Sequence, residues 1–231
     1  MEPKLREAAV IELLDRLPAE FNSILIGGYA VCAYGPARYS EDVDLVVPAE
    51  KSEALRAWLI QEGFRVSMTM RPSPSTSDLG KLLISKGSVK GAVFVGGVRS
   101  RDSGAVLDYP WIAIRPRNVR LLLVAGRTQS AVMVVRLEAL WALKLLAARA
   151  QDLTDLFSIS PAPFDAEEVS QKLKSLPGAQ TRGAFRSARS FVGSDKEYLD
   201  ALSRRSMGSP DSSSNIRAWE TFRSKVNRVL P

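Results

Sequence analysis

The chain has 231 residues and a formal net charge of +7, and its composition of 45% hydrophobic and 25% charged residues is typical of a globular protein with a substantial core. It contains one cysteine and no histidine, which excludes an internal disulfide, a cysteine-rich zinc site and every role that needs an imidazole group. Any bound metal must therefore be held largely by oxygen atoms, which favours a hard cation such as Mg²⁺ or Mn²⁺.

No apolar run approaches the roughly 18 to 20 residues of a membrane-spanning helix, and the charged opening MEPKLREAAV is unlike a secretion signal. A single cysteine also fits a reducing compartment. The sequence therefore predicts a cytoplasmic protein with no membrane partner.

Residues 1–130 alternate between helical and extended patterns. Helical spacing of apolar residues predicts helices in LREAAVIELLDRL, GYAVCAYG and AEKSEALRAWLIQEGF. Extended segments are predicted in NSILIGG, SEDVDLVV, FRVSMTM, KLLISKGSVKGAVFVGGV, AVLDYPWIAI and VRLLLVAG, the fourth of them as two strands about a turn. The polar, proline-rich segment RPSPSTSDLG is predicted to be a loop. These patterns indicate an α/β (α+β) domain over residues 1–130.

The pattern becomes helical from MVVRLEALWALKLLAARAQDLTDLFSI onward. Beyond Pro161, further helices are predicted in FDAEEVSQKLKSL, KEYLDALSRR and IRAWETFRSKVNRVL, joined by serine- and glycine-rich turns such as GSPDSSSN. This predicts a second, helical domain over residues 131–231.

Two aspartates interrupt an otherwise apolar strand pattern. On a strand, Ser40, Asp42 and Asp44 would share one face while Val43 and Leu45 point into the core. The backbones of Asp42 and Asp44 would be about 6.6 Å apart, so both carboxylates could lean toward one cation or a pair of cations. A divalent cation would also remove the repulsion between them. The alternative is a solvated strand face.

A glycine pair precedes this strand. A strand that ends in Gly27-Gly28 and opens a helix exposes backbone N–H groups, and the absence of side chains lets a phosphate come close. Arg38, just before the acidic strand, could clamp a phosphate oxygen. A metal site beside a phosphate cradle is the equipment for phosphoryl or nucleotidyl transfer.

The stretch GGYAVCAYGPARYSEDVDLVV resembles the signature of the DNA polymerase beta-like nucleotidyltransferase superfamily, and it is similar to the minimal nucleotidyltransferases of prokaryotic toxin–antitoxin and abortive-infection systems. A second stretch, LEALWALKLLAARAQDLTDL, resembles the helical segment of AbiEii-type toxins, with Lys144, Asp152 and Asp155 at the lysine and Asp-x-x-Asp-Leu positions. One continuous helix would place Lys144 and Asp155 on one face, because 11 residues make nearly whole turns. A surface ion pair is the alternative interpretation.

The resemblance implies a nucleotidyltransferase fold, with a small mixed sheet flanked by helices and a helical C-terminal region. It implies a nucleoside triphosphate as substrate and Mg²⁺ or Mn²⁺ as cofactor; an acceptor oxygen attacks the α-phosphorus and pyrophosphate leaves. By this resemblance seven residues have roles: Asp42 and Asp44 as catalytic metal ligands, and Gly27, Gly28, Arg38, Ser40 and Lys144 as nucleotide-binding residues.

A third catalytic carboxylate is harder to find. Active members of the superfamily usually bring it from a later strand, where it helps to activate the acceptor hydroxyl. The strand KGAVFVGG has Ala92 and Val93 where an acid would be expected, so we expect Asp108, on the following extended segment, to supply it. Without that carboxylate, the chain would be a degenerate module that binds nucleotide or RNA, or a non-catalytic toxin–antitoxin component.

Basic residues outnumber acidic ones in two regions. Seven arginines lie from Arg99 to Arg136 against two aspartates, and residues 161–231 hold 12 basic and 8 acidic side chains. Either region could bind a polyanion. Because toxins of the resembled family are thought to modify RNA or a partner protein, we expect a structured RNA acceptor and allow for an antitoxin partner. A small-molecule acceptor and a merely solvated basic surface are the alternatives.

Overall fold

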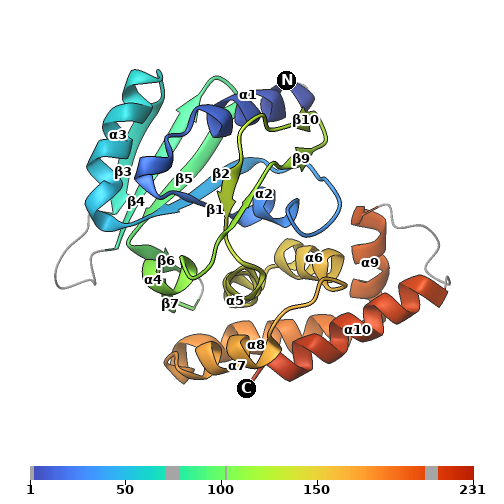
Figure 1. The fold of residues 1–231 in the computed structure, drawn as a ribbon. Helices are drawn as coiled ribbons and strands as arrows, with labels where there is room; N and C mark the ends of the chain where they lie inside the picture. The colour runs from blue at the N-terminus through green and yellow to red at the C-terminus, as the bar shows by residue number, and fades with distance from the viewer. Residues whose placement is uncertain (1–2, 71–78, 102, 206–212) are drawn as a thin grey trace. The chain divides into compact units, whose positions relative to one another are not determined.

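The computed structural model of the chain describes residues 3–70, 79–101, 103–205 and 213–231 (Figure 1). The chain divides into two compact units. The N-terminal unit comprises Met1–Arg99 and Leu107–Arg136, and the C-terminal unit comprises Ser100–Val106 and Leu137–Pro231. The predicted loop RPSPSTSDLG and turn GSPDSSSN lie largely outside the described residues.

Within the described residues, seven strands of the N-terminal unit form one mixed sheet in the order β3-β4-β5-β2-β1-β11-β8 (Figure 1). Their bounds are β1 (Ile24–Ile26), β2 (Asp42–Val47), β3 (Arg65–Met70), β4 (Gly80–Lys86), β5 (Val89–Val95), β8 (Arg117–Val119) and β11 (Val132–Val134). The pairs β2·β5 and β1·β11 are parallel, and the other neighbouring pairs are antiparallel. The expected mixed α/β fold is confirmed.

The remaining elements of this part of the chain are short strands and helices. Four short strands form two separate pairs. Strand β6 (Gly97–Arg99) pairs with β7 (Val106–Asp108), and β9 (Leu122–Leu123) pairs antiparallel with β10 (Gly126–Arg127). The helices are α1 (Pro3–Arg16), α2 (Gly27–Val31), α3 (Ser52–Gln61), α4 (Tyr109–Ile112) and the 3₁₀ turns η1 (Ala19–Phe21) and η2 (Ala49–Lys51).

Strand β2 explains why two aspartates occur in an apolar run. Asp42 is exposed, Val43 is buried, Asp44 is half-buried and Leu45 is buried, which is the alternation predicted from the sequence. From Leu45 onward every residue of β2 is buried, because the strand lies between β1 and β5 in the centre of the sheet. Only the amino-terminal end of β2 therefore presents polar side chains.

One predicted extended segment is partly helical. In AVLDYPWIAI only Val106–Asp108 is a strand, and Tyr109–Ile112 forms α4. Pro110 lies in the first turn of α4, where its missing N–H costs nothing and its fixed φ suits a helix start. The chain therefore turns directly after Asp108.

The described residues of the C-terminal unit are mainly helical, as predicted. Its helices are α5 (Leu137–Ala147), α6 (Ala150–Ile159), α7 (Ala166–Lys174), α8 (Gly178–Val192), α9 (Asp195–Arg205) and α10 (Ser213–Val229). Aromatic rings form its core: Phe157 lies 5.6 Å from Phe222 and 5.1 Å from Trp219 between ring centroids. Among the described helices of either unit, none has the length and apolar character needed to cross a membrane.

The expectation of one continuous helix through Lys144 and Asp155 is wrong. Helix α5 ends at Ala147 and α6 begins at Ala150, so the two residues lie on different helices. The break occurs at Ala148, whose φ of 46° is incompatible with a right-handed helix. Met133 and Val134, also predicted as helical, belong to strand β11.

Candidate functional site

The two glycines after β1 are packed closely against the start of β2. Gly27 has a φ of +70°, which glycine adopts far more readily than other residues. A Cβ atom on Gly27 would lie 2.5 Å from Oδ2 of Asp44, and one on Gly28 would lie 2.2 Å from Oγ of Ser40 and 2.8 Å from Nη2 of Arg38. The structure therefore brings these five predicted site residues together, and no side chain larger than hydrogen fits at either glycine without displacement.

Hydrogen bonds from α2 hold the loop that contains Arg38 and Ser40. The Tyr29 hydroxyl donates to the Ser40 carbonyl at 2.9 Å, and the Cys32 thiol donates to the Arg38 carbonyl at 3.7 Å. Burial raises the pKa of Tyr29 to about 12, so its phenol remains a proton donor at neutral pH. Tyr29 thus positions this loop, a role that sequence reasoning missed although Tyr29 directly follows the glycine pair.

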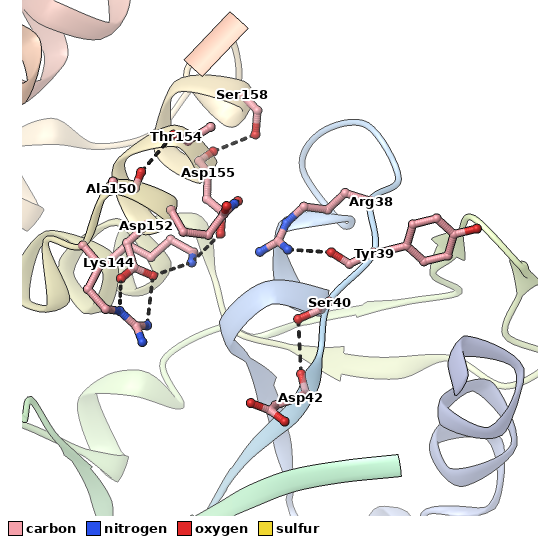
Figure 2. A network of polar contacts seen from close by, with 12 residues as sticks. Arg38, Tyr39, Ser40, Asp42, Lys144, Ala150, Asp152, Thr154, Asp155 and Ser158 are labelled. Atoms are coloured by element: carbon pink, nitrogen blue, oxygen red, sulfur yellow. Dashed lines mark hydrogen bonds and ion pairs between the residues drawn. The ribbon is translucent and has the colours of Figure 1, made fainter. Parts of the chain in front are cut away.

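Polar contacts within the loop continue into β2. Nη1 of Arg38 donates to the Tyr39 carbonyl at 2.7 Å, and Oγ of Ser40 donates to the Asp42 carbonyl at 3.3 Å (Figure 2). Asp42 follows directly as the first residue of the strand. The loop and the acidic end of β2 therefore form one connected polar surface.

The neighbouring strand β5 contributes no carboxylate beside the two aspartates. In the parallel β2·β5 pair, Asp42 is in register with Lys90 and Asp44 with Ala92, so each pair shares a face of the sheet. Lys90 is exposed and Ala92 is buried. Sequence reasoning noted Ala92 but not Lys90, because the register between strands so far apart in the chain cannot be read from the sequence.

Asp108 lies at the opposite end of β2. The Tyr109 N–H donates to the Gly96 carbonyl, and the Gly96 N–H donates to the Val47 carbonyl, which places Asp108 beside the last residue of β2. Asp42 is five residues away along this strand, or about 16 Å. The structure therefore does not bring Asp108 to Asp42 and Asp44, because the chain turns at Gly96–Gly97 and continues away from the acidic end.

The donor set at the start of β2 suits magnesium held jointly with a substrate. In the part of the chain that the structure describes, no three Asp, Glu or Cys side chains gather in a way that could hold a metal ion. Mg²⁺ in nucleotide sites is commonly bound through one or two carboxylates, with waters and substrate phosphates completing the octahedron. Asp42 and Asp44 supply the two carboxylates of this pattern. They are too few to hold a metal ion without ligands from a substrate or water.

Lys144 belongs to a buried ionic network in the C-terminal unit (Figure 2). Its Nζ lies 3.0 Å from Oδ1 of Asp152 and 2.7 Å from Oδ2 of Asp155. Arg149 Nε donates to the other oxygen of Asp152 at 2.7 Å, and Gln151 Nε2 donates to the other oxygen of Asp155 at 3.0 Å. Two cations therefore balance two carboxylates, and all four carboxylate oxygens accept hydrogen bonds.

This network joins α5 to α6 across the break at Ala148. Lys144 is 5% exposed, Asp152 4% and Asp155 0%. The ion pairs of Lys144 are therefore buried, which excludes the alternative interpretation of a surface ion pair. Removing one partner of such a buried pair leaves an uncompensated charge, which is strongly destabilising. A phosphate contact by Lys144 stays a prediction. Sequence reasoning missed Arg149 and Gln151, which lie three and four residues before Asp152 and Asp155, a spacing that brings side chains together on one helix.

The fold has counterparts among solved structures. No protein-family model matches the chain, and no curated protein matches it in sequence. The chain is similar to MenT4, the nucleotidyltransferase toxin Rv2826c from Mycobacterium tuberculosis H37Rv, with a TM-score of 0.50 and 14% identity over 97% of this chain and 82% of that chain. We conclude that the chain has a nucleotidyltransferase fold, as the sequence resemblance implied.

Two further structures are similar to the chain. JHP933 from Helicobacter pylori gives a TM-score of 0.47 with 13% identity over 99% of this chain and 92% of that chain. ANT(2")-Ia in complex with adenylyl-2"-tobramycin gives 0.40 with 17% identity over 87% of this chain and 98% of that chain.

Proposed function

We propose that the chain is a nucleotidyltransferase that moves a nucleoside monophosphate from a nucleoside triphosphate to an acceptor hydroxyl. The proposal is supported above all by the convergence at the start of β2, where the Gly27-Gly28 backbone meets Ser40, Arg38 and Asp44. A backbone without side chains, a guanidinium and paired carboxylates are the groups that a triphosphate with its metal requires. The fold similarity to a nucleotidyltransferase toxin agrees with this chemistry.

Each residue has a role in the proposed reaction. The backbone N–H groups of Gly27 and Gly28 bind the terminal phosphates, and Arg38 and Ser40 contact phosphate oxygens. Asp42 and Asp44 would hold Mg²⁺, which neutralises charge on the attacking and leaving oxygens when it is bound. A bond forms between the acceptor oxygen and the α-phosphorus as the hydroxyl proton passes to water and the bond to the bridging oxygen breaks, and pyrophosphate leaves. Positioning and electrostatics supply most of the rate.

A transfer assay tests this proposal. The full chain is incubated with each α-labelled triphosphate, Mg²⁺ and total RNA or purified protein, and label in the acceptor is measured. We expect transfer by the unchanged chain and by Asp108→Asn, because Asp108 lies at the far end of β2, but none by Asp44→Asn. Equal labelling with Asp44→Asn would refute the site.

A second candidate function is a nucleotide-binding module without catalysis. It is favoured by the register that sets Lys90 and Ala92, rather than a carboxylate, beside Asp42 and Asp44. A site without a nearby base activates an acceptor hydroxyl poorly. Magnesium-dependent triphosphate binding without transfer to any acceptor would identify the chain as this module.

We propose RNA as the acceptor and a toxin role in the cytoplasm, with an antitoxin as partner. The similarity to a nucleotidyltransferase toxin and the basic composition support this assignment. Expression of the full chain in a bacterial host should arrest growth, and expression of Asp44→Asn should not. Growth arrest by both would show that toxicity does not depend on nucleotidyl transfer.

A further inference from the structure

The positive charge of the C-terminal unit is concentrated on two of its described helices. Helices α8 and α10 together carry seven basic residues and one acidic residue, Glu220. Helices α7 and α9 carry equal numbers of basic and acidic residues. The excess charge is therefore a property of α8 and α10 and not of the unit as a whole.

Helices α8 and α10 pack together through their apolar faces. Phe191 of α8 lies 5.8 Å from Trp219 and 6.5 Å from Phe222 of α10 between ring centroids. The arginines of these helices are exposed, so their charged heads lie outside this contact: Arg182, Arg186, Arg189, Arg217, Arg223 and Arg228.

The arginines of α8 line a pocket at one face of the helix. Arg182, Arg186 and Arg189 are spaced by four and three residues, which places them on one face over about 10 Å of helix rise. They line a cavity of about 430 Å³ with Gly178, Thr181, Phe185 and Pro231, and no acidic residue lines it. Over the described residues, none of the three arginines pairs with an acidic side chain, and Arg189 donates to an oxygen of Pro231. We call this cavity the α8 arginine pocket.

We propose that the α8 arginine pocket binds the phosphodiester backbone of RNA, which rests on the proposed function in that RNA is the acceptor. Guanidinium groups bind phosphate oxygens through paired N–H donors. A nucleic-acid strand carries one charge per roughly 3.4 Å of axis, so the arginine row spans about three successive phosphates. A row of three arginines suits a polymer better than a single small anion, and α10, which packs against α8, carries further exposed arginines. Phe185, the aromatic residue that lines the pocket, is buried, so the pocket offers phosphate contacts, which carry no sequence information, and no exposed ring for base stacking.

Salt-dependent RNA binding by charge-matched variants tests the proposal. Fluorescence anisotropy is measured with the full chain and transfer RNA at rising salt, without triphosphate or Mg²⁺. One variant is Arg182→Gln/Arg186→Gln; its control, Lys174→Gln/Lys196→Gln, removes the same charge from exposed positions on α7 and α9. Arg189 stays unchanged because it bonds to Pro231.

We expect the arginine variant to bind RNA more weakly. The slope of log affinity against log salt concentration should become less steep by roughly 0.7 to 0.9 for each phosphate contact removed, while the control keeps the wild-type slope. Equal losses in both variants would show a general charge effect and overturn the proposal. Binding of tripolyphosphate that is as tight as that of RNA and is weakened by the same arginine substitutions would also overturn it, since a polymer would then not be the ligand of this pocket. Thermal unfolding of each variant verifies folding.

The outcome is separable from that of the proposed function. Magnesium–triphosphate binding is measured in the same arginine variant, whose substitutions are remote in sequence from the glycine pair and the aspartates. If the chain binds triphosphate but its RNA binding does not change when Arg182 and Arg186 are substituted, only the α8 arginine pocket is refuted. RNA binding through the α8 arginine pocket by a chain that binds no triphosphate refutes the nucleotidyltransferase proposal and leaves the pocket standing.

Discussion

At the level of single residues, the absence of a Cβ atom at Gly28 decides how closely the glycine pair can approach Ser40. In Gly28→Ala the new Cβ would lie 2.2 Å from Oγ of Ser40, so the loop must shift away from the glycine turn. We expect magnesium–triphosphate affinity to fall on the order of tenfold or more, which is about 1.4 kcal/mol per tenfold. Isothermal titration calorimetry measures the change.

Gly183→Ala is the matched control. Gly183 lies within α8, and a Cβ there would meet nothing within 4 Å. Alanine in place of glycine inside a helix stabilises by roughly 0.5 to 1 kcal/mol, so this variant should unfold at a higher temperature and bind triphosphate normally. If both glycine variants bind triphosphate like the wild type, the glycine turn is not part of a phosphate site.

Lys144 is the residue on which the α5–α6 network depends. Lys144→Met leaves Asp155 buried with no cation, and we expect a loss of about 3 to 5 kcal/mol in the free energy of unfolding. Arg149→Met is the comparison, because Arg149 binds the same Asp152 but its side chain is 72% exposed; its loss should cost less than about 1 kcal/mol. Urea denaturation measures both. If both variants lost less than about 1 kcal/mol in the free energy of unfolding, the network would not stabilise the packing of α5 against α6.

At the level of elements, a buried carboxylate joins α1 to the turn between β9 and β10. Glu7 is fully buried, and its Oε2 accepts the Ala125 N–H. Burial raises the pKa of Glu7 above its ordinary value of 4.5, so the folded state favours the protonated form. Stability from this group is therefore full below about pH 4.5 and declines as the pH rises through the folded-state pKa.

Glu7→Gln tests this linkage. Glutamine keeps the carbonyl acceptor for Ala125 and resembles the protonated acid at every pH. We expect the variant to be more stable than the wild type near neutral pH and to lose less stability on going from acidic to neutral pH. Thermal unfolding across this range measures it. Parallel pH profiles for the two proteins would show that Glu7 titrates normally in the folded state.

The elements also show what could be inferred from the sequence and what could not. Local periodicity predicted that Asp42 and Asp44 share one face of β2 opposite Val43 and Leu45, and the glycine pair predicted the end of β1. Lys90 beside Asp42, and Asp108 at the far end of β2, depend on strand pairing between distant segments. The break at Ala148 has no glycine or proline signal, so a continuous helix was the natural prediction.

At the level of the whole molecule, the two units differ in the chemistry that their side chains offer. The N-terminal unit holds the glycine turn and the acidic end of β2, which suit a triphosphate with its metal. The C-terminal unit holds the buried Lys144 network, which stabilises the packing of α5 against α6. It also holds the arginines of α8 and α10, which suit the binding of a polyanion. We therefore expect substitutions in the glycine turn and the acidic end of β2 to impair nucleotide binding, and substitutions of the α8 arginines to impair RNA binding.

Magnesium-dependent triphosphate binding by Asp42→Asn/Asp44→Asn is the most direct test of the proposed site. Asp42 is exposed and Asp44 half-buried, so the variant should fold normally, with Asp108→Asn as a control at the other end of β2. Each of the four triphosphates is titrated calorimetrically into the full chain with and without Mg²⁺. We predict that the wild type and Asp108→Asn bind at least one triphosphate only when Mg²⁺ is present, and that the double variant loses this binding. Equal affinity of the wild type and the double variant in Mg²⁺ would contradict the assignment of these aspartates.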